Sequence, residues 1–272
     1  IPTGTGIDLL AWLHLWLAGW GVFRLVKALG GSDIGGVFAG LTFQLSPFML
    51  AWTPLPSVIS TVAWIPWLWA GVARVAMERI DSRRAGVFAA VGVGAPLAAQ
   101  FLAGHLQFAA YGCLGAVILA IGLLARRASA ELESAFAWKP VLLTAVAGVG
   151  LGAILAAPQM IPVLKYSQQS HRRAAPSEEG YKAYVGLALP PTEALSRLVA
   201  PFAQGNPLKF DEQLPTQFLP AIVRPGANFA ESATTVGPFA IGFAALAFLH
   251  RGRRRANLSL ASIAGLSFLL AI

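Results

Sequence analysis

Long apolar stretches separated by short polar links set the pattern of this sequence. Most of these stretches have close to the ~20 residues that a helix needs to cross a bilayer. Eight can be marked, covering residues 7–28, 34–52, 58–77, 85–103, 108–125, 140–157, 236–249 and 256–272. The seventh is short, and the eighth stops where the chain ends. The pattern predicts an all-α membrane protein, a polytopic bundle of about eight transmembrane helices.

The links divide the chain into three parts. Residues 1–157 hold six predicted transmembrane helices, 158–235 form one long outer segment, and 236–272 hold the last two helices. Within the outer segment, Leu195, Leu198, Val199 and Phe202 recur at helical spacing after a pair of prolines. This spacing predicts a short helix lying on the membrane surface. The stretch 205–226 is rich in Pro, Gly and polar residues, which indicates a loop over a site.

Basic residues indicate which way the bundle faces. If the predicted helices alternate in direction, thirteen of the 20 Lys and Arg residues fall on one side, and that side is cytoplasmic by the positive-inside rule. The short links 53–57 and 104–107 contain no Lys or Arg and face outward, as does the long segment 158–235. We expect the chain to cross a membrane several times.

Composition and charge argue against a soluble domain and against a nucleic-acid partner. Hydrophobic residues make up 56% of the chain and charged residues 12%, about half the share usual in soluble domains. The net charge of +8 does not indicate a nucleic-acid partner, because the basic residues stand in short clusters between apolar stretches. Cys113 is the single cysteine and lies in an apolar stretch, where we expect it to serve packing.

The polar turn between the fourth and fifth stretches is the first candidate for chemistry. It reads Gly104-His105-Leu106-Gln107, and we expect it to lie at the outer membrane surface. His105 and Gln107 could simply snorkel from a hairpin turn. They could instead line a polar site just outside the hydrocarbon, where ionisable groups often mark a pathway or a reaction centre. Both interpretations stay open at this point.

The start of the outer segment is the second candidate. Gln159, Lys165, His171 and Arg172 follow closely on the sixth stretch, and their donors could grip phosphate oxygens. The same residues could merely meet lipid headgroups. Glu231 is the carboxylate closest to the start of the seventh stretch. It is a weaker candidate for binding an acceptor or a metal.

A few polar and aromatic residues lie within the stretches themselves. His14, Gln44 and Gln100 are expected to hydrogen-bond between helices, and glycines are expected to let helices approach closely. Tryptophans are predicted mainly to form a belt near the headgroups. These are Trp12, Trp52, Trp64, Trp67 and Trp69.

Several short motifs in order resemble the YfhO-like bacterial membrane proteins, which are similar to the GT-C class of integral-membrane glycosyltransferases. The likeness covers nearly the whole chain. It includes a Leu-Ala-Trp-Leu-His-Leu-Trp-Leu-Ala-Gly run, the Gly104 turn, Ala-Pro-Gln-Met-Ile-Pro before Ser-His-Arg, and Leu-Pro-Pro. Gly-Asn-Pro and Asn-Phe-Ala-Glu before Val-Gly complete it; the quoted runs begin at 10, 104, 157, 170, 189, 205, 228 and 236.

The resemblance implies a GT-C-like fold in the bacterial cytoplasmic (inner) membrane. The implied reaction is the transfer of a sugar from a polyprenyl-phosphate carrier to a glycan or lipid acceptor on the outer face of that membrane. It also implies a catalytic carboxylate in the first outer loop, ahead of residue 1, so no residue in hand is assigned as catalytic. Because the sequence does not begin with Met and its last apolar stretch stops in mid-span, the chain is expected to be a fragment of a longer protein. His105 and Gln107 would contact the sugar or the carrier phosphate, and Lys165, His171 and Arg172 would hold phosphate. A divalent cation would be compatible with this chemistry, and no other cofactor is expected.

Two other functions remain open. A transporter or flippase for a lipid-linked substrate would need broken helices or ionisable groups near the bilayer midplane. The third alternative is a non-catalytic membrane protein that helps to assemble the cell envelope. Binding of a polyprenyl phosphate without turnover would favour it.

Overall fold

The computed structural model describes residues 3–130, 138–169, 177–185, 238–247, 249 and 254–269. Within these residues the chain is helical and contains no strand. Six spans are long and apolar enough to cross a bilayer. The prediction of a multi-pass helical membrane protein is therefore confirmed, whereas eight spans are not. The first five helices are α1 (Thr3–Ala28), α2 (Asp33–Gln44), α3 (Pro47–Ala51), α4 (Pro56–Met77) and α5 (Arg83–Leu102). They are followed by α6 (Leu106–Ala130), α7 (Trp138–Ser167), α8 (Glu178–Val185), α11 (Pro238–Ala247) and α12 (Arg254–Leu269).

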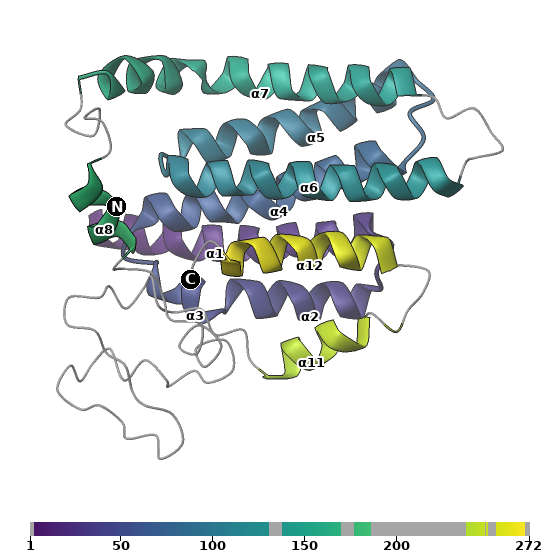
Figure 1. The fold of residues 1–272 in the computed structure, drawn as a ribbon, viewed down its shortest axis with the longest axis horizontal. Helices are drawn as coiled ribbons and strands as arrows, with labels where there is room; N and C mark the ends of the chain where they lie inside the picture. Colours follow the sequence, from purple (N-terminus) through teal and green to yellow (C-terminus); the bar gives the residue numbers. More distant parts are fainter. Residues whose placement is uncertain are drawn as a thin grey trace.

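Helix α4 is the centre of the bundle. Its apolar stretch is 67% buried, against at most 33% for any other span. It packs against α1, α5 and α6, while α7 packs on α5, α2 on α1 and α12 on α6 (Figure 1). Small and aliphatic residues such as Ile59, Ala63 and Ala73 fill these contacts and are almost fully buried.

Successive long helices run in opposite directions, which gathers charged residues at one end of the bundle. Lys27 Nζ lies 2.8 Å from Asp33 Oδ1, and Arg74 Nε lies 3.1 Å from Glu78 Oε1. Arg127 Nη1 donates to two carbonyl oxygens just past and within the last turn of α4, at 3.1 Å each. We name this the basic end, on the right of Figure 1, and the other the turn end.

Glycines let three pairs of helices meet backbone to backbone. A Cβ added at Gly40 would lie 2.6 Å from the Gly19 carbonyl oxygen, where α2 crosses α1. One added at Gly71 would lie 2.2 Å from the Gly92 carbonyl oxygen, where α4 crosses α5. One added at Gly94 would lie 2.7 Å from the Gly148 carbonyl oxygen, where α5 crosses α7. The expectation that small residues permit close approach is confirmed at these crossings.

The second predicted stretch is not one helix. Helix α2 ends at Gln44, and the Ser46 hydroxyl accepts from Met49 N–H to begin α3. Pro47 follows at the first turn of α3 and has no N–H for a hydrogen bond back to Phe43 O. The polar Gln-Leu-Ser-Pro sequence therefore interrupts an otherwise apolar span.

The helix of the sixth predicted stretch is longer than predicted. Helix α7 continues past 157 to Ser167, and its 30 residues span about 45 Å, the thickness of a bilayer with its headgroups. Helix α11 has only 10 described residues and α12 has 16. The predicted surface helix over 194–203 and the loop over 205–226 lie outside the described residues.

Candidate functional site

The turn between α5 and α6 organises the turn end. Gly104 has φ +94°, a conformation that glycine adopts without strain, and it reverses the chain between Leu102 and Leu106. His105 N–H donates to Thr61 Oγ1 at 3.3 Å, which ties the turn to α4. Thr61 Oγ1 in turn donates to Ser57 O at 2.8 Å and lies 3.4 Å from Gln100 O.

Aromatic side chains surround this tie. The His105 ring lies 4.7 Å from the Phe108 ring, measured between centroids. Phe108 also meets Phe48 at 5.6 Å and Trp52 at 6.5 Å. We call Trp52, Thr61, Gln100, His105 and Phe108 the turn cluster. Thr61, Gln100 and Phe108 come from α4, α5 and α6, Trp52 follows α3, and His105 lies in the turn between α5 and α6.

Three buried polar atoms of the turn cluster have no hydrogen-bond partner within the described part of the chain. They are Trp52 Nε1, Gln100 Oε1 and His105 Nδ1. Leaving one such group unpaired costs roughly 1–3 kcal/mol, so each needs an explanation. Gln100 Oε1 faces Gly112 of α6, one helical turn deeper than Phe108. The Trp52 indole is a donor, the Gln100 oxygen is an acceptor, and the His105 nitrogen can be either. A hydroxyl group both donates and accepts, so it can pair with any atom of this set.

Gln159 is the predicted site residue that the structure brings to the turn. A Cβ added at Gly104 would lie 3.7 Å from Gln159 Nε2, so α7 passes directly beside the residue that precedes His105. Lys165 lies two turns later on the same helix, about 9 Å farther along its axis, and is exposed. Both residues belong to α7 and not to a loop.

Gln107 is not part of the same contact network. Its side chain is exposed, and its amide donates to the Tyr111 hydroxyl at 2.9 Å along the outside of α6. His171, Arg172 and Glu231, the other predicted site residues, lie outside the described residues.

Sequence reasoning missed Trp52, Thr61 and Asp8. Trp52 was predicted to anchor at the headgroups, yet its side chain is only 6% exposed. Asp8 precedes Ala11 and Leu15 by one and two turns of α1, and these two pack in the same core cluster as Trp52. An acidic residue at the start of an apolar stretch was the available signal. It places a carboxylate at the turn end.

Of the polar residues within the apolar stretches, His14 and Gln100 hydrogen-bond within their own helices. The His14 Nδ1 ring nitrogen bonds to Leu10 O at 2.8 Å, and Gln100 Nε2 bonds to Pro96 O at 3.4 Å. The Gln44 side chain instead covers Gly19 of α1. Within the described residues, neither His14 nor Gln100 makes the predicted interhelical hydrogen bond from its side chain, because a carbonyl of the preceding helical turn takes each donor.

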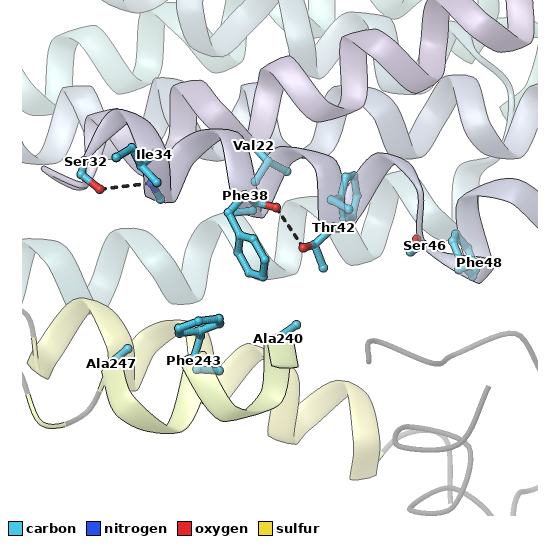
Figure 2. Close-up of a pocket in the computed structure, with 14 residues that line it drawn as sticks. Val22, Ser32, Ile34, Phe38, Thr42, Ser46, Phe48, Ala240, Phe243 and Ala247 are labelled. Carbon is cyan, nitrogen blue, oxygen red and sulfur yellow. Dashed lines mark hydrogen bonds between the residues drawn. The ribbon is translucent and has the colours of Figure 1, made fainter. Parts of the chain in front are cut away.

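A hollow lies between α2 and α11 (Figure 2). Its volume is about 980 Å³, and phenylalanines such as Phe38 and Phe243 line it. Its hydroxyls are already in use: Ser32 accepts from Gly35 N–H, Thr42 donates to Phe38 O, and Ser46 caps α3. Among the described residues, the lining of this groove is mainly apolar.

The described residues contain no cluster of side chains that could bind a metal ion. Among them, no three His, Cys, Asp or Glu side chains come together.

No family model, curated protein or solved structure matches this chain. The resemblance to the YfhO-like proteins therefore rests on the motifs of the sequence alone.

Proposed function

We propose that this chain is part of a membrane glycosyltransferase of the GT-C type. It would move a sugar from a polyprenyl-phosphate carrier to a cell-envelope acceptor at the outer face of the bacterial cytoplasmic membrane. The turn cluster would bind the sugar and the carrier phosphate, and the basic end would face the cytoplasm. The sequence motifs suggest the reaction, and the unpartnered atoms of the turn cluster are the observation that supports a site here.

The position of the cluster suits a lipid-linked substrate. It lies at the helix ends, where a polyprenyl chain can stay in the hydrocarbon while its phosphate and sugar reach polar groups. Trp52 Nε1–H, His105 Nδ1 and Gln100 Oε1 can exchange hydrogen bonds with sugar hydroxyls. Gln159 and Lys165 on α7 add an amide and a cation on the side toward which a phosphate would lie.

The reaction itself sets what else is needed. The bond between the anomeric carbon and the phosphate oxygen breaks, and a bond from that carbon to the acceptor oxygen forms. A carboxylate takes the acceptor proton, and donors stabilise the departing phosphate. Asp8 supplies a carboxylate at the turn end, and the resemblance implies another ahead of residue 1.

A transporter or flippase is the second candidate, because one observation favours it. The break between α2 and α3 is a discontinuity in a membrane span, which many transporters use. However, the break lies toward the turn end, with hydroxyl and backbone groups already bonded to each other. We therefore place the transporter second.

The test uses the full-length protein in nanodiscs with a polyprenyl-phosphate sugar labelled in the sugar. We expect release of polyprenyl phosphate together with transfer of label to an extract of envelope glycans. Binding of the carrier without turnover would overturn the enzyme proposal in favour of a non-catalytic role. Movement of intact carrier between leaflets of proteoliposomes, again without turnover, would favour the flippase.

Gln100 offers a separate check, because a binding role and a packing role predict opposite outcomes. Gln100→Met keeps the length of the side chain and removes the unpaired Oε1, which is fully buried. We expect the free energy of unfolding in micelles to stay level or rise by about 1 kcal/mol, while sugar transfer falls. Unfolding by guanidinium and the transfer assay measure the two effects. Loss of stability with unchanged transfer would contradict the binding role.

A further inference from the structure

A charged groove at the basic end has no part in the proposed reaction. It has a volume of about 620 Å³ and runs between α1 and α5, with α4 as its floor. A stripe of α4 residues at helical spacing lines the floor, from Trp64 and Trp67 through Gly71 to Arg74. The groove therefore changes from aromatic to cationic toward the basic end.

Its aromatic part is held firmly in place. Trp67 Nε1–H donates to Leu17 O at 2.9 Å, and the Trp67 ring meets the Trp20 ring edge-on at 5.7 Å. Trp64 lies 6.4 Å from Trp67, centroid to centroid. These rings give a fixed apolar wall deep in the bundle.

The charged part of the groove has three cationic side chains and two carboxylates, so its net charge is positive. The groove is lined by Arg24, Lys27 and Arg74 and by the carboxylates of Asp33 and Glu78. Lys27 pairs with Asp33 and Arg74 with Glu78, which leaves Arg24 without an ion pair in the described part of the chain. The four side chains of these pairs are 43–77% exposed, so each pair is weak and can open for a competing anion.

The length of the groove floor matches the thickness of one leaflet of the bilayer. From Trp64 to Arg74 the floor extends about 15 Å, half of the ~30 Å hydrocarbon thickness. A phospholipid of the leaflet at the basic end could therefore place an acyl chain along Trp64 and Val91 with its phosphate beside Arg24. The guanidinium fork suits phosphate oxygens, and basic pockets between helices on the cytoplasmic side are known to hold acidic lipids.

We propose that this groove binds an acidic phospholipid from the leaflet at the basic end. The excess positive charge selects a lipid with a net negative headgroup over a zwitterionic one, and the tryptophan floor holds an acyl chain. The bound lipid would link α1, α4 and α5 independently of any reaction at the turn cluster.

The test is native mass spectrometry of the full-length protein with phosphatidylglycerol and with phosphatidylcholine of the same acyl chains. We expect retention of phosphatidylglycerol and a roughly tenfold weaker affinity for it in Arg24→Gln, from loss of one charge-assisted contact. Arg79→Gln is the matched control, because Arg79 is exposed at the same end but does not line the groove. Its affinity should be unchanged.

A second variant tests the apolar part without disturbing the fold. A Cβ at Gly92 meets no atom within 4 Å, so Gly92→Leu should fill the groove from α5 and weaken lipid binding. Equal retention of phosphatidylcholine, equal loss in both arginine variants, or undiminished binding in Gly92→Leu would each overturn the proposal. Binding of glycerol phosphate with the affinity of the lipid would reduce it to a free-phosphate site and overturn the role of the acyl chain.

Discussion

His105→Ala in the full-length protein should abolish sugar transfer while leaving membrane insertion intact. The change removes the unpartnered ring nitrogen but keeps the backbone N–H that donates to Thr61 Oγ1. Removing one donor that acts on the reacting groups of an enzyme lowers the rate by about 100-fold or more. Mass spectrometry of the modified glycans, at equal protein level in the membrane fraction, measures the effect.

His14→Ala is the matched control for this experiment. His14 is also a histidine of the helix bundle, but its ring nitrogen is already bonded to Leu10 O within α1. Transfer should persist in this variant. Normal glycans in His105→Ala, or equal loss in both variants, would mean that the turn cluster does not contact the substrate.

Gly71→Ala should destabilise the bundle more than other glycine substitutions of the same size. The new Cβ would lie 2.2 Å from the Gly92 carbonyl oxygen, and backbone cannot move aside as a flexible side chain can. Helices α4 and α5 must separate, at a cost of about 2–3 kcal/mol for an overpacked contact. The free energy of unfolding in micelles measures the loss.

The other partner of the same crossing supplies the control. Gly92→Ala adds the same methyl group one helix away, where no atom lies within 4 Å, and alanine favours a helix over glycine. Its stability should stay level or rise slightly. A similar loss in both variants would show that α4 and α5 do not approach through their glycines.

The sequence pattern was sufficient for the parts of the fold that depend on length and apolarity. The spans of α1, α4, α5 and α6 agree with prediction within a few residues, because a long apolar stretch can satisfy its backbone in a membrane only as a helix. The gathering of Arg24, Arg74 and Arg127 at one end followed from simple alternation. Helix breaks and extensions were harder to predict from the sequence. Pro47 stands at a helix break, whereas Pro158 and Pro162 lie inside a continuous helix.

The candidate site was only partly predictable. The Gly104 turn could be marked because His105 and Gln107 stand out between apolar stretches, but the sequence could not tell which of the two faces inward. Trp52 was assigned to the membrane surface because a tryptophan near a helix end usually anchors there. Its burial depends on how α4 and α6 pack, with Phe108 against its ring. The neighbours of Ile59, Thr61 and Gln100 are likewise set by the packing of the helices, which the sequence pattern does not show.

The two prolines of α7 have a consequence for hydration. Neither Pro158 nor Pro162 has an N–H, so the carbonyls of Ile154 and Pro158 lack the donors that a regular helix would supply. In hydrocarbon each such carbonyl would be costly, and water is the natural donor to it. The end of α7 beside Gln159 should therefore be wetter than its surroundings. A raised local dielectric there lowers the cost for a charged headgroup to approach the helix bundle from the membrane surface.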